Sequence, residues 1–129
     1  MNIAIKFRAW QSVMRTMTYS DKYDSLEDFF ARNYENNVYT TISQFIGLLD
    51  SNGEEIYVGD VVKYTSRYRG DVMGCVVVFD SKQGQYKFCP FSMYKANAGN
   101  GGWTGFEYTM ASRTEIIGNI YENPALLEE

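Results

Sequence analysis

The sequence predicts a mainly β fold with a minor helical part: a small, strongly bent sheet or SH3-like barrel with an N-terminal strand hairpin and one short helix. Three observations carry this prediction. The chain begins with alternating apolar and polar residues, continues with one amphipathic segment that has a capping residue, and ends with short β-type segments separated by turns. The 129 residues are expected to form a single domain, 1–129, with a hairpin-and-helix subregion at 1–45 and a barrel-like subregion at 46–129.

The first subregion is predicted to contain a hairpin and a helix. Alternation over residues 3–10 predicts a strand, and residues 14–19 are expected to return antiparallel to it. The expected buried face of this strand carries Ile3, Ile5, Phe7 and Ala9. Residues 25–32 predict the helix, because Ser25 suits an N-cap, acidic residues follow it and Arg32 lies near the end. Leu26, Phe29 and Phe30 are expected to face the core.

The second subregion is predicted to be β-rich. Strands are expected at 38–46, 60–64, 72–79, 85–89 and 114–120, and the strand at 72–79 is apolar enough to be buried on both faces. Asn52-Gly53 and residues 81–84 predict sharp turns. Residues 95–105 predict a glycine-rich loop before a further strand at 106–110, and Asn123-Pro124 predicts a final helical turn.

Composition excludes several function classes. The chain has no His, so Ser-His-Asp and Cys-His catalysis are excluded. A formal net charge of -4 is the opposite of the overall footprint of a duplex-binding protein, so any nucleic-acid contact has to be local. No apolar run approaches the roughly 20 residues that cross a bilayer as a helix. We expect a soluble cytoplasmic protein that has no membrane partner.

The two cysteines, Cys75 and Cys89, are too few for a disulfide scaffold, and without His they cannot complete a tetrahedral zinc site unless carboxylates or a second subunit contribute. Buried, reduced thiols are the expected state. The hairpin formed by residues 72–79 and 85–89 is expected to place Cys75 opposite or beside Cys89, and whether they ever pair is left open. No cofactor and no metal are expected.

Several short motifs occur together in one order along the chain. They are Lys6-Phe7-Arg8-Ala9-Trp10, Gly47-Leu48 with Asp50, Asn52-Gly53, Glu55-Ile56-Tyr57, Gly59-Asp60-Val61-Val62 and Ile117-Gly118-Asn119-Ile120-Tyr121-Glu122-Asn123-Pro124 with Leu126-Leu127. In this order they resemble the YopX family. The resemblance implies a small, mostly β protein that is encoded by phages and prophages and lives in the bacterial cytoplasm. Turn-forming residues dominate these motifs, so they indicate structural roles more than a reaction.

Basic residues interleaved with aromatic ones give the candidate binding residues. The densest cluster is Lys63, Tyr64, Arg67, Tyr68 and Arg69, and a second is expected on the outward face of the first strand at Lys6, Arg8 and Trp10. Such clusters suit single-stranded nucleic acid, where bases stack on rings and cations meet phosphates. An ordinary mixed surface is the favoured explanation, because small domains keep mixed charges outside and the chain as a whole is acidic. Trp103, in the glycine-rich loop, is a further candidate for stacking on a ligand or inserting into a partner.

Two other candidate sites have simpler structural interpretations. The glycine-rich loop matches neither the P-loop nor the dinucleotide-binding pattern. The carboxylates Asp50, Glu54, Glu55 and Asp60 are interpreted as solvated turn residues in preference to a cation site or an acid and base pair.

The function predicted from these observations is that of a non-enzymatic phage or prophage accessory protein, a module that binds an unknown protein or a single-stranded nucleic acid in the bacterial cytoplasm. A self-assembling structural or regulatory oligomer is the alternative, because 16% aromatic residues exceed what one small core requires. The acidic balance also permits an inhibitor that mimics nucleic acid. An enzyme built on carboxylates or on Cys89 is the least favoured class, because no nucleophile is paired with a base.

Overall fold

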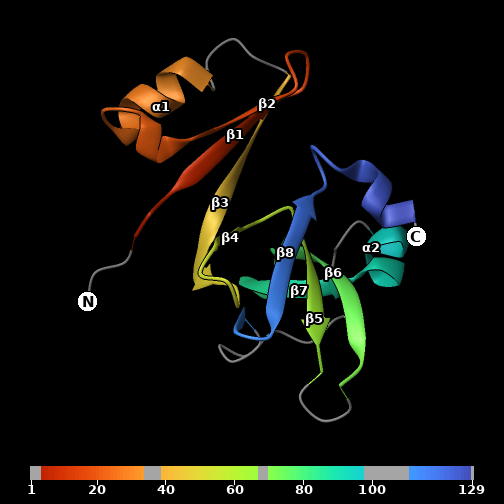
Figure 1. The fold of residues 1–129 in the computed structure, drawn as a ribbon. Helices are drawn as coiled ribbons and strands as arrows, with labels where there is room; N and C mark the ends of the chain where they lie inside the picture. Colours follow the sequence, from red (N-terminus) through yellow and green to blue (C-terminus); the bar gives the residue numbers. More distant parts are fainter. Residues whose placement is uncertain (1–3, 34–38, 67–69, 98–110, 129) are drawn as a thin grey trace. The chain divides into compact units, whose positions relative to one another are not determined.

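The computed structural model describes residues 4–33, 39–66, 70–97 and 111–128 (Figure 1). The elements, in chain order, are β1 (Phe7–Gln11), β2 (Thr16–Tyr19), η1 (Ser20–Lys22), α1 (Leu26–Asn33), β3 (Thr40–Leu49), β4 (Glu55–Tyr57), β5 (Asp60–Thr65), β6 (Val72–Asp80), β7 (Gln85–Pro90), α2 (Phe91–Asn97), β8 (Thr114–Asn119) and η2 (Pro124–Glu128). The strands follow the orders β2-β1-β3-β4 and β7-β6-β5-β8. The predicted mainly β class with a strongly bent sheet is therefore confirmed.

The chain divides into two compact units, residues 1–45 and 46–129, so that β3 contributes residues 40–45 to the first and 46–49 to the second. In the first unit β1 pairs antiparallel with both β2 and β3. The turn between β1 and β2 is held by the Gln11 side chain, whose Oε1 accepts a hydrogen bond from the Val13 amide at 2.8 Å. Arg15 closes this turn with a φ of +55°, in the left-handed region that non-glycine residues rarely occupy.

The predicted helix is present as α1 and begins with the expected cap. Ser25 Oγ accepts a hydrogen bond from the Asp28 amide at 3.0 Å, which satisfies one of the free N–H groups of the first turn. Phe29 is fully buried, and the Phe30 ring meets the Phe7 ring edge-on at 5.0 Å. Leu26 stands at the first position of the helix and is 38% exposed, so its predicted core position is wrong.

The first strand is shorter than predicted and has a different buried set. It spans Phe7–Gln11, while Ile5 precedes it and is 57% exposed. Arg8 and Trp10, expected to point outward, are buried at 2% and 7% exposure. The alternation rule assumes one open face, whereas the consecutive residues Arg8, Ala9 and Trp10 are all buried, so both faces of β1 are covered here. The arginine is accommodated by a hydrogen bond from its Nε to Ser43 Oγ at 3.1 Å.

The second unit contains the strongly curled sheet β7-β6-β5-β8 (Figure 1). One face of this sheet is called the Val62 face below. It carries a core of Ile56, Val62, Cys75, Val77, Phe88 and Ala111. The opposite face is called the α2 face. On it lie Val76, Val78 and Cys89, and the side chains that pack against them are Phe91, Met93, Tyr94, Ile120 and Leu127. In Figure 1 the C-terminal η2 lies beside α2, so both cover this face of the sheet.

The strands of this unit agree largely with the predicted ones. The middle of β6 is buried on both faces, as expected, whereas Val72, Met73 and Phe79 near its ends are exposed. The predicted turn at Asn52-Gly53 is present, with a Gly53 φ of +81°. Residues 95–97, predicted as the start of a loop at 95–105, belong instead to α2. The rest of that loop and the predicted strand at 106–110 lie outside the described residues.

The two cysteines are neighbours in the sheet but face opposite sides of it. Cys89 lies across from Val76 and Cys75 lies across from Pro90, so the β6–β7 register is offset by one residue from a direct Cys75–Cys89 pair. Cys75 belongs to the core of the Val62 face and Cys89 to that of the α2 face. Both thiols are free and buried, which confirms their predicted state.

Candidate functional site

A groove of about 480 Å³ opens on the second unit where β5, β6 and β8 end. The residues that line it are Ser51, Lys63, Thr65, Val72, Arg113, Thr114 and Glu115. This set combines two cations, three hydroxyl groups, one carboxylate and one apolar side chain. It is called the Lys63 groove below.

The strand ladder explains why these residues gather. Lys63 lies directly across from Glu115, and the Thr65 amide donates to the Arg113 carbonyl at 3.1 Å, so the β5–β8 ladder continues beyond Lys63. Thr65 lies across from Val72 on the other side. Side chains two residues apart on a strand share a face, so the cations and the carboxylate project from one face of the sheet.

That face is the α2 face, and α2 covers only part of it. Helix α2 packs on β6 and β7, where the Phe91 ring fills the space above Gly74; a Cβ at Gly74 would come within 2.6 Å of this ring. Gly74 on β6 lies directly across from Lys63 on β5. The β5–β8 part of the face, beyond the helix, is left open and forms the groove.

A buried carboxylate fixes one rim of the groove. Asp50 Oδ1 accepts hydrogen bonds from the amides of Asn52 and Glu54, both at 2.9 Å, and Oδ2 accepts one from the Ile116 amide at 3.0 Å. The Ser51 amide donates to the Thr114 carbonyl at 2.9 Å. The turn that follows β3 is thereby fastened to the outer edge of β8, and this fastening brings Ser51 to the groove.

Donor groups without protein partners dominate the groove. Within the described residues, the side chains of Lys63 and Arg113 form no ion pair and no hydrogen bond, and the hydroxyl groups of Ser51 and Thr65 also have no partner. The Thr114 hydroxyl is different because it is buried and donates to the Ala111 carbonyl at 2.8 Å. Two cations and two hydroxyl groups can all donate hydrogen bonds to an anionic oxygen ligand such as phosphate.

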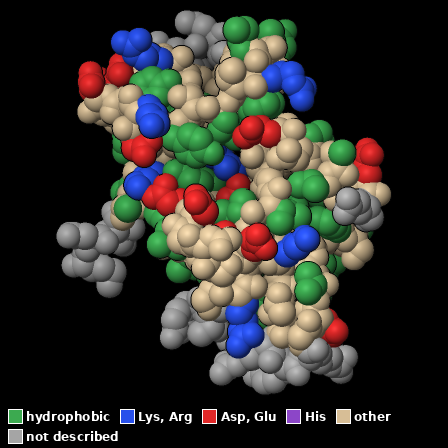
Figure 2. Space-filling view, in the orientation of Figure 1, with side chains coloured by type: hydrophobic (Ala, Val, Ile, Leu, Met, Phe, Trp, Pro, Cys, Tyr) green, Lys and Arg blue, Asp and Glu red, His purple; other side chains and the backbone are tan. Residues whose placement is uncertain are grey.

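The charge of the groove is local. Figure 2 shows Lys and Arg side chains interspersed with Asp and Glu across the visible face. The chain as a whole carries a formal charge of -4. An anion in the groove is therefore attracted mainly by Lys63 and Arg113, because salt screens the charges that lie more than about 8–10 Å away.

The structure separates the residues of the predicted basic and aromatic cluster. Lys63 lines the groove, whereas Tyr64 points to the opposite face and packs against the core there. Arg67, Tyr68 and Arg69 lie outside the described residues, as does Trp103. Arg113 and Glu115 were not among the sequence candidates.

The second predicted cluster does not form an outward basic surface. Arg8 and Trp10 are buried, as described above. Lys6 is half-buried, and its Nζ lies 5.9 Å from the centre of the Phe45 ring, within the range of a cation–π contact. These three side chains are therefore part of the packing around β1.

The family-like motifs serve the fold. Asp60 is buried, and its Oδ2 accepts a hydrogen bond from the Tyr57 amide at 2.7 Å. Gly59 has a φ of +94°, and a Cβ there would come within 2.7 Å of the Tyr121 ring. Asn119 Oδ1 accepts a hydrogen bond from the Tyr121 amide at 3.1 Å and so orders the turn after β8. Asp50 and Asp60 are thus buried structural groups, and the prediction that they are solvated is wrong.

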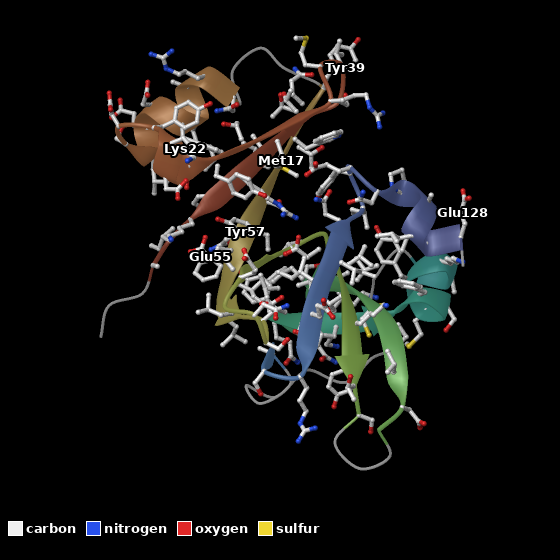
Figure 3. The ribbon with its side chains drawn as sticks, in the orientation of Figure 1. Met17, Lys22, Tyr39, Glu55, Tyr57 and Glu128 are labelled. Atoms are coloured by element: carbon white, nitrogen blue, oxygen red, sulfur yellow. The ribbon has the colours of Figure 1, made fainter. Side chains whose placement is uncertain are left out.

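The remaining reactive groups are either buried or engaged with neighbours. Asp80 and Lys87 form a buried ion pair at 2.8 Å, and the hydrogen bond from Lys87 lowers the pKa of Asp80. Burial raises the pKa of Cys75 to about 12 and also raises the pKa of Cys89. On β4 the Tyr57 hydroxyl donates to Glu55 Oε1 at 3.5 Å, and Figure 3 shows both residues on this strand.

The described residues contain neither a membrane-spanning helix nor a cluster of metal ligands. No helix in this part of the chain is long and apolar enough to cross a membrane. No group of three or more Cys, Asp or Glu side chains there is arranged to hold a metal ion.

The fold and groove define a small, β-rich protein with a curled half-barrel sheet and a polar groove. The family model described as YopX protein matches residues 6–128, so the chain belongs to the YopX family. Its fold is similar to the crystal structure of protein EF1440 from Enterococcus faecalis, with a TM-score of 0.60 and 20% identity over 98% of this chain and 99% of that one. No curated protein matches the chain.

Proposed function

We propose that this YopX-family protein is a non-enzymatic binding module whose Lys63 groove holds the phosphate backbone of a single-stranded nucleic acid. The observation that carries the proposal is the donor set of the groove. Lys63, Arg113, Ser51 and Thr65 converge there without protein partners in the described part of the chain. Phosphate oxygens are the acceptors that such a set of donors matches.

The charge distribution favours a single strand over a duplex. A duplex offers phosphates on two strands, and proteins that grip it use a broad basic face. This chain is acidic overall, and two cations occupy one short groove. A single strand can follow a narrow groove with its backbone and place a base on an apolar side chain, and Val72 at 64% exposure offers such a surface.

A binding role also agrees with the state of the reactive side chains. A nucleophilic cysteine needs a lowered pKa, whereas burial raises the pKa of both thiols. The buried carboxylates of Asp50 and Asp60 accept hydrogen bonds from backbone amides, and Asp80 is paired with Lys87. These groups stabilise the fold, so we infer that the protein acts by binding.

Fluorescence anisotropy with labelled single- and double-stranded oligonucleotides, at low and at physiological salt, tests the proposal. Wild-type protein is expected to bind the single strand saturably and more tightly than the duplex. Lys63→Ala and Arg113→Ala should each weaken binding by about five- to tenfold, the effect of losing one charge-assisted contact. Lys82→Ala is the matched control, because Lys82 is an exposed cation of the same unit in the turn between β6 and β7. Equal affinity of all four proteins would remove the groove as the site.

The setting of this activity is inferred from the family. We propose that the protein acts in the bacterial cytoplasm as a product of a phage or prophage, as the resemblance implies. Expression of a tagged chain from its native locus, followed by cell fractionation, tests the location. A membrane or secreted fraction would contradict it.

Self-association stays a prediction of the sequence. Exposed apolar side chains at the turn between β1 and β2, Val13 and Met14, are 65% and 71% exposed and favour it. Sedimentation equilibrium at high micromolar concentration tests it, and a single species of 14.8 kDa would exclude it.

A further inference from the structure

The Lys63 groove contains one carboxylate among its donors. Glu115 lies on β8 directly across from Lys63, and its side chain is exposed on the same face. Directly opposed residues of an antiparallel pair have Cβ atoms about 5 Å apart, so Glu115 and Lys63 border the same part of the groove. Within the described residues, the Glu115 carboxylate forms no ion pair and accepts no hydrogen bond.

A phosphate backbone cannot use this carboxylate. A phosphodiester has acceptor oxygens only, so beside Glu115 it meets a second negative group and gains nothing from it. A ligand that fits the whole groove therefore presents a hydrogen-bond donor close to its phosphate. In a DNA strand such donors belong to the bases, because exocyclic amino groups occur on cytosine, adenine and guanine.

The apolar part of the groove shows where a base would lie. Val72, Thr65 and Arg113 are neighbours across three strands, and Lys63 and Glu115 form the adjoining pair. An exposed valine offers the face of a base an apolar contact that a charged phosphate does not use. A base seated on Val72 lies on the same sheet face as Glu115.

We propose that Glu115 is a specificity-determining residue that accepts a hydrogen bond from the exocyclic amino group of a base, so that the groove prefers amino-bearing bases to thymine. This inference rests on the proposed function, since it assigns the base in a strand whose phosphates contact Lys63 and Arg113. Thymine presents carbonyl oxygens at the corresponding positions, and these are repelled by a carboxylate.

The test compares deoxycytidine and thymidine homopolymers of equal length by anisotropy at low salt and neutral pH. Wild-type protein is expected to bind the cytidine strand about tenfold more tightly, the contribution of one hydrogen bond to a charged group. Glu115→Gln should bring the two affinities to within about twofold of each other, because an amide offers thymine a donor and cytosine an acceptor. Glu128→Gln, at an exposed glutamate in η2 of the same unit (Figure 3), should keep the tenfold preference.

The outcomes separate this inference from the proposed function. Equal affinity of the wild-type protein for both strands, with Glu115→Gln raising both alike, would mean that Glu115 only repels phosphate. The inference would then be wrong while the nucleic-acid site stands. Preference for RNA over DNA of the same sequence, lost in Glu115→Gln, would assign the carboxylate to the 2′-hydroxyl group and overturn the assignment to a base. Absence of binding to every strand at low salt would overturn both proposals.

Discussion

Asp50 connects two parts of the second unit, and its replacement gives the most quantitative prediction about the fold. Its carboxylate is 6% exposed and accepts three backbone hydrogen bonds. Two come from the turn that it begins, at Asn52 and Glu54, and the third comes from Ile116 on β8, which is 66 residues away in the chain. Asp50→Asn and Asp50→Ala remove these acceptors to different extents.

The cost of each change follows from this geometry. A hydrogen bond to a charged group contributes about 1.5–3 kcal/mol, and an amide left buried without an acceptor costs about 1–3 kcal/mol. In Asp50→Ala the turn amides can be hydrated, whereas the Ile116 amide remains at the sheet edge without its partner, so we expect a loss of about 4 kcal/mol in the free energy of unfolding. Asp50→Asn keeps one acceptor oxygen but directs an NH₂ group toward the Ile116 amide, and a loss of about 2 kcal/mol is expected.

Urea unfolding followed by tryptophan fluorescence and circular dichroism measures these losses as shifts of the midpoint at constant m. Glu54→Gln is the control, because the side chain of Glu54 is exposed in the same turn, and its effect should stay within about 0.5 kcal/mol. Amide exchange supplies a local measurement, since the Ile116 amide should lose protection in Asp50→Asn. A loss below about 1 kcal/mol for Asp50→Ala would refute the reasoning that Asp50 fastens the turn to β8.

Three further predictions concern backbone strain, thiol burial and charge. Arg15→Gly should raise the free energy of unfolding by about 1 kcal/mol in a thermal or urea denaturation, because the φ of +55° is strained for arginine and not for glycine. An unchanged or lower free energy of unfolding would contradict the strain at Arg15. Cys75 and Cys89 should react with iodoacetamide at pH 8 only at the rate of unfolding, since both are buried with raised pKa values, and rapid labelling of native protein, detected by mass spectrometry, would count against it. The pKa of Asp80 is lowered in the folded state, so its ionised carboxylate contributes stability that is fully present above the ordinary pKa of 3.8 and is lost as the pH falls through the lower folded pKa. The difference in unfolding free energy between wild type and Asp80→Asn should therefore be constant above about pH 5 and shrink below pH 4. A difference that grows on acidification would contradict the pairing of Asp80 with Lys87.

Features with local causes could be predicted from the sequence. The helix was located because Ser25 caps it and acidic residues follow, and both features are properties of neighbouring residues. The turn at Asn52-Gly53 follows from the tolerance of glycine for positive φ. The pairing of β6 with β7 follows from a short turn between two apolar segments.

Features that depend on tertiary contacts could not be predicted in this way. Helix α2 has no acidic first turn, and it is stabilised by the packing of Phe91, Met93 and Tyr94 on the α2 face. The burial of Arg8 requires knowledge that both faces of β1 are covered and that Ser43 lies across from it on β3.

In the candidate site, too, one residue could be predicted from its sequence neighbours and others could not. Lys63 was identified because basic and aromatic residues surround it in the sequence, and the structure places it at a groove. Arg113 and Glu115 lie about fifty positions further along, and their approach depends on the β5–β8 register, which includes an irregularity between Val61 and Val62. Alternation of charged residues around Thr114 was a signal that they share a face, but the sequence gives no register to join that face to Lys63.

The salt dependence of single-strand binding tests the central claim most directly. For single strands the slope of log K against log salt concentration is about -0.7 for each phosphate contacted, so a groove in which Lys63 and Arg113 each meet one phosphate predicts a slope of about -1.4. The double replacement Lys63→Ala with Arg113→Ala is expected to bring the slope close to zero, whereas Lys82→Ala should leave it unchanged. A double variant that keeps the full wild-type slope would show that the cations of the Lys63 groove do not bind the strand.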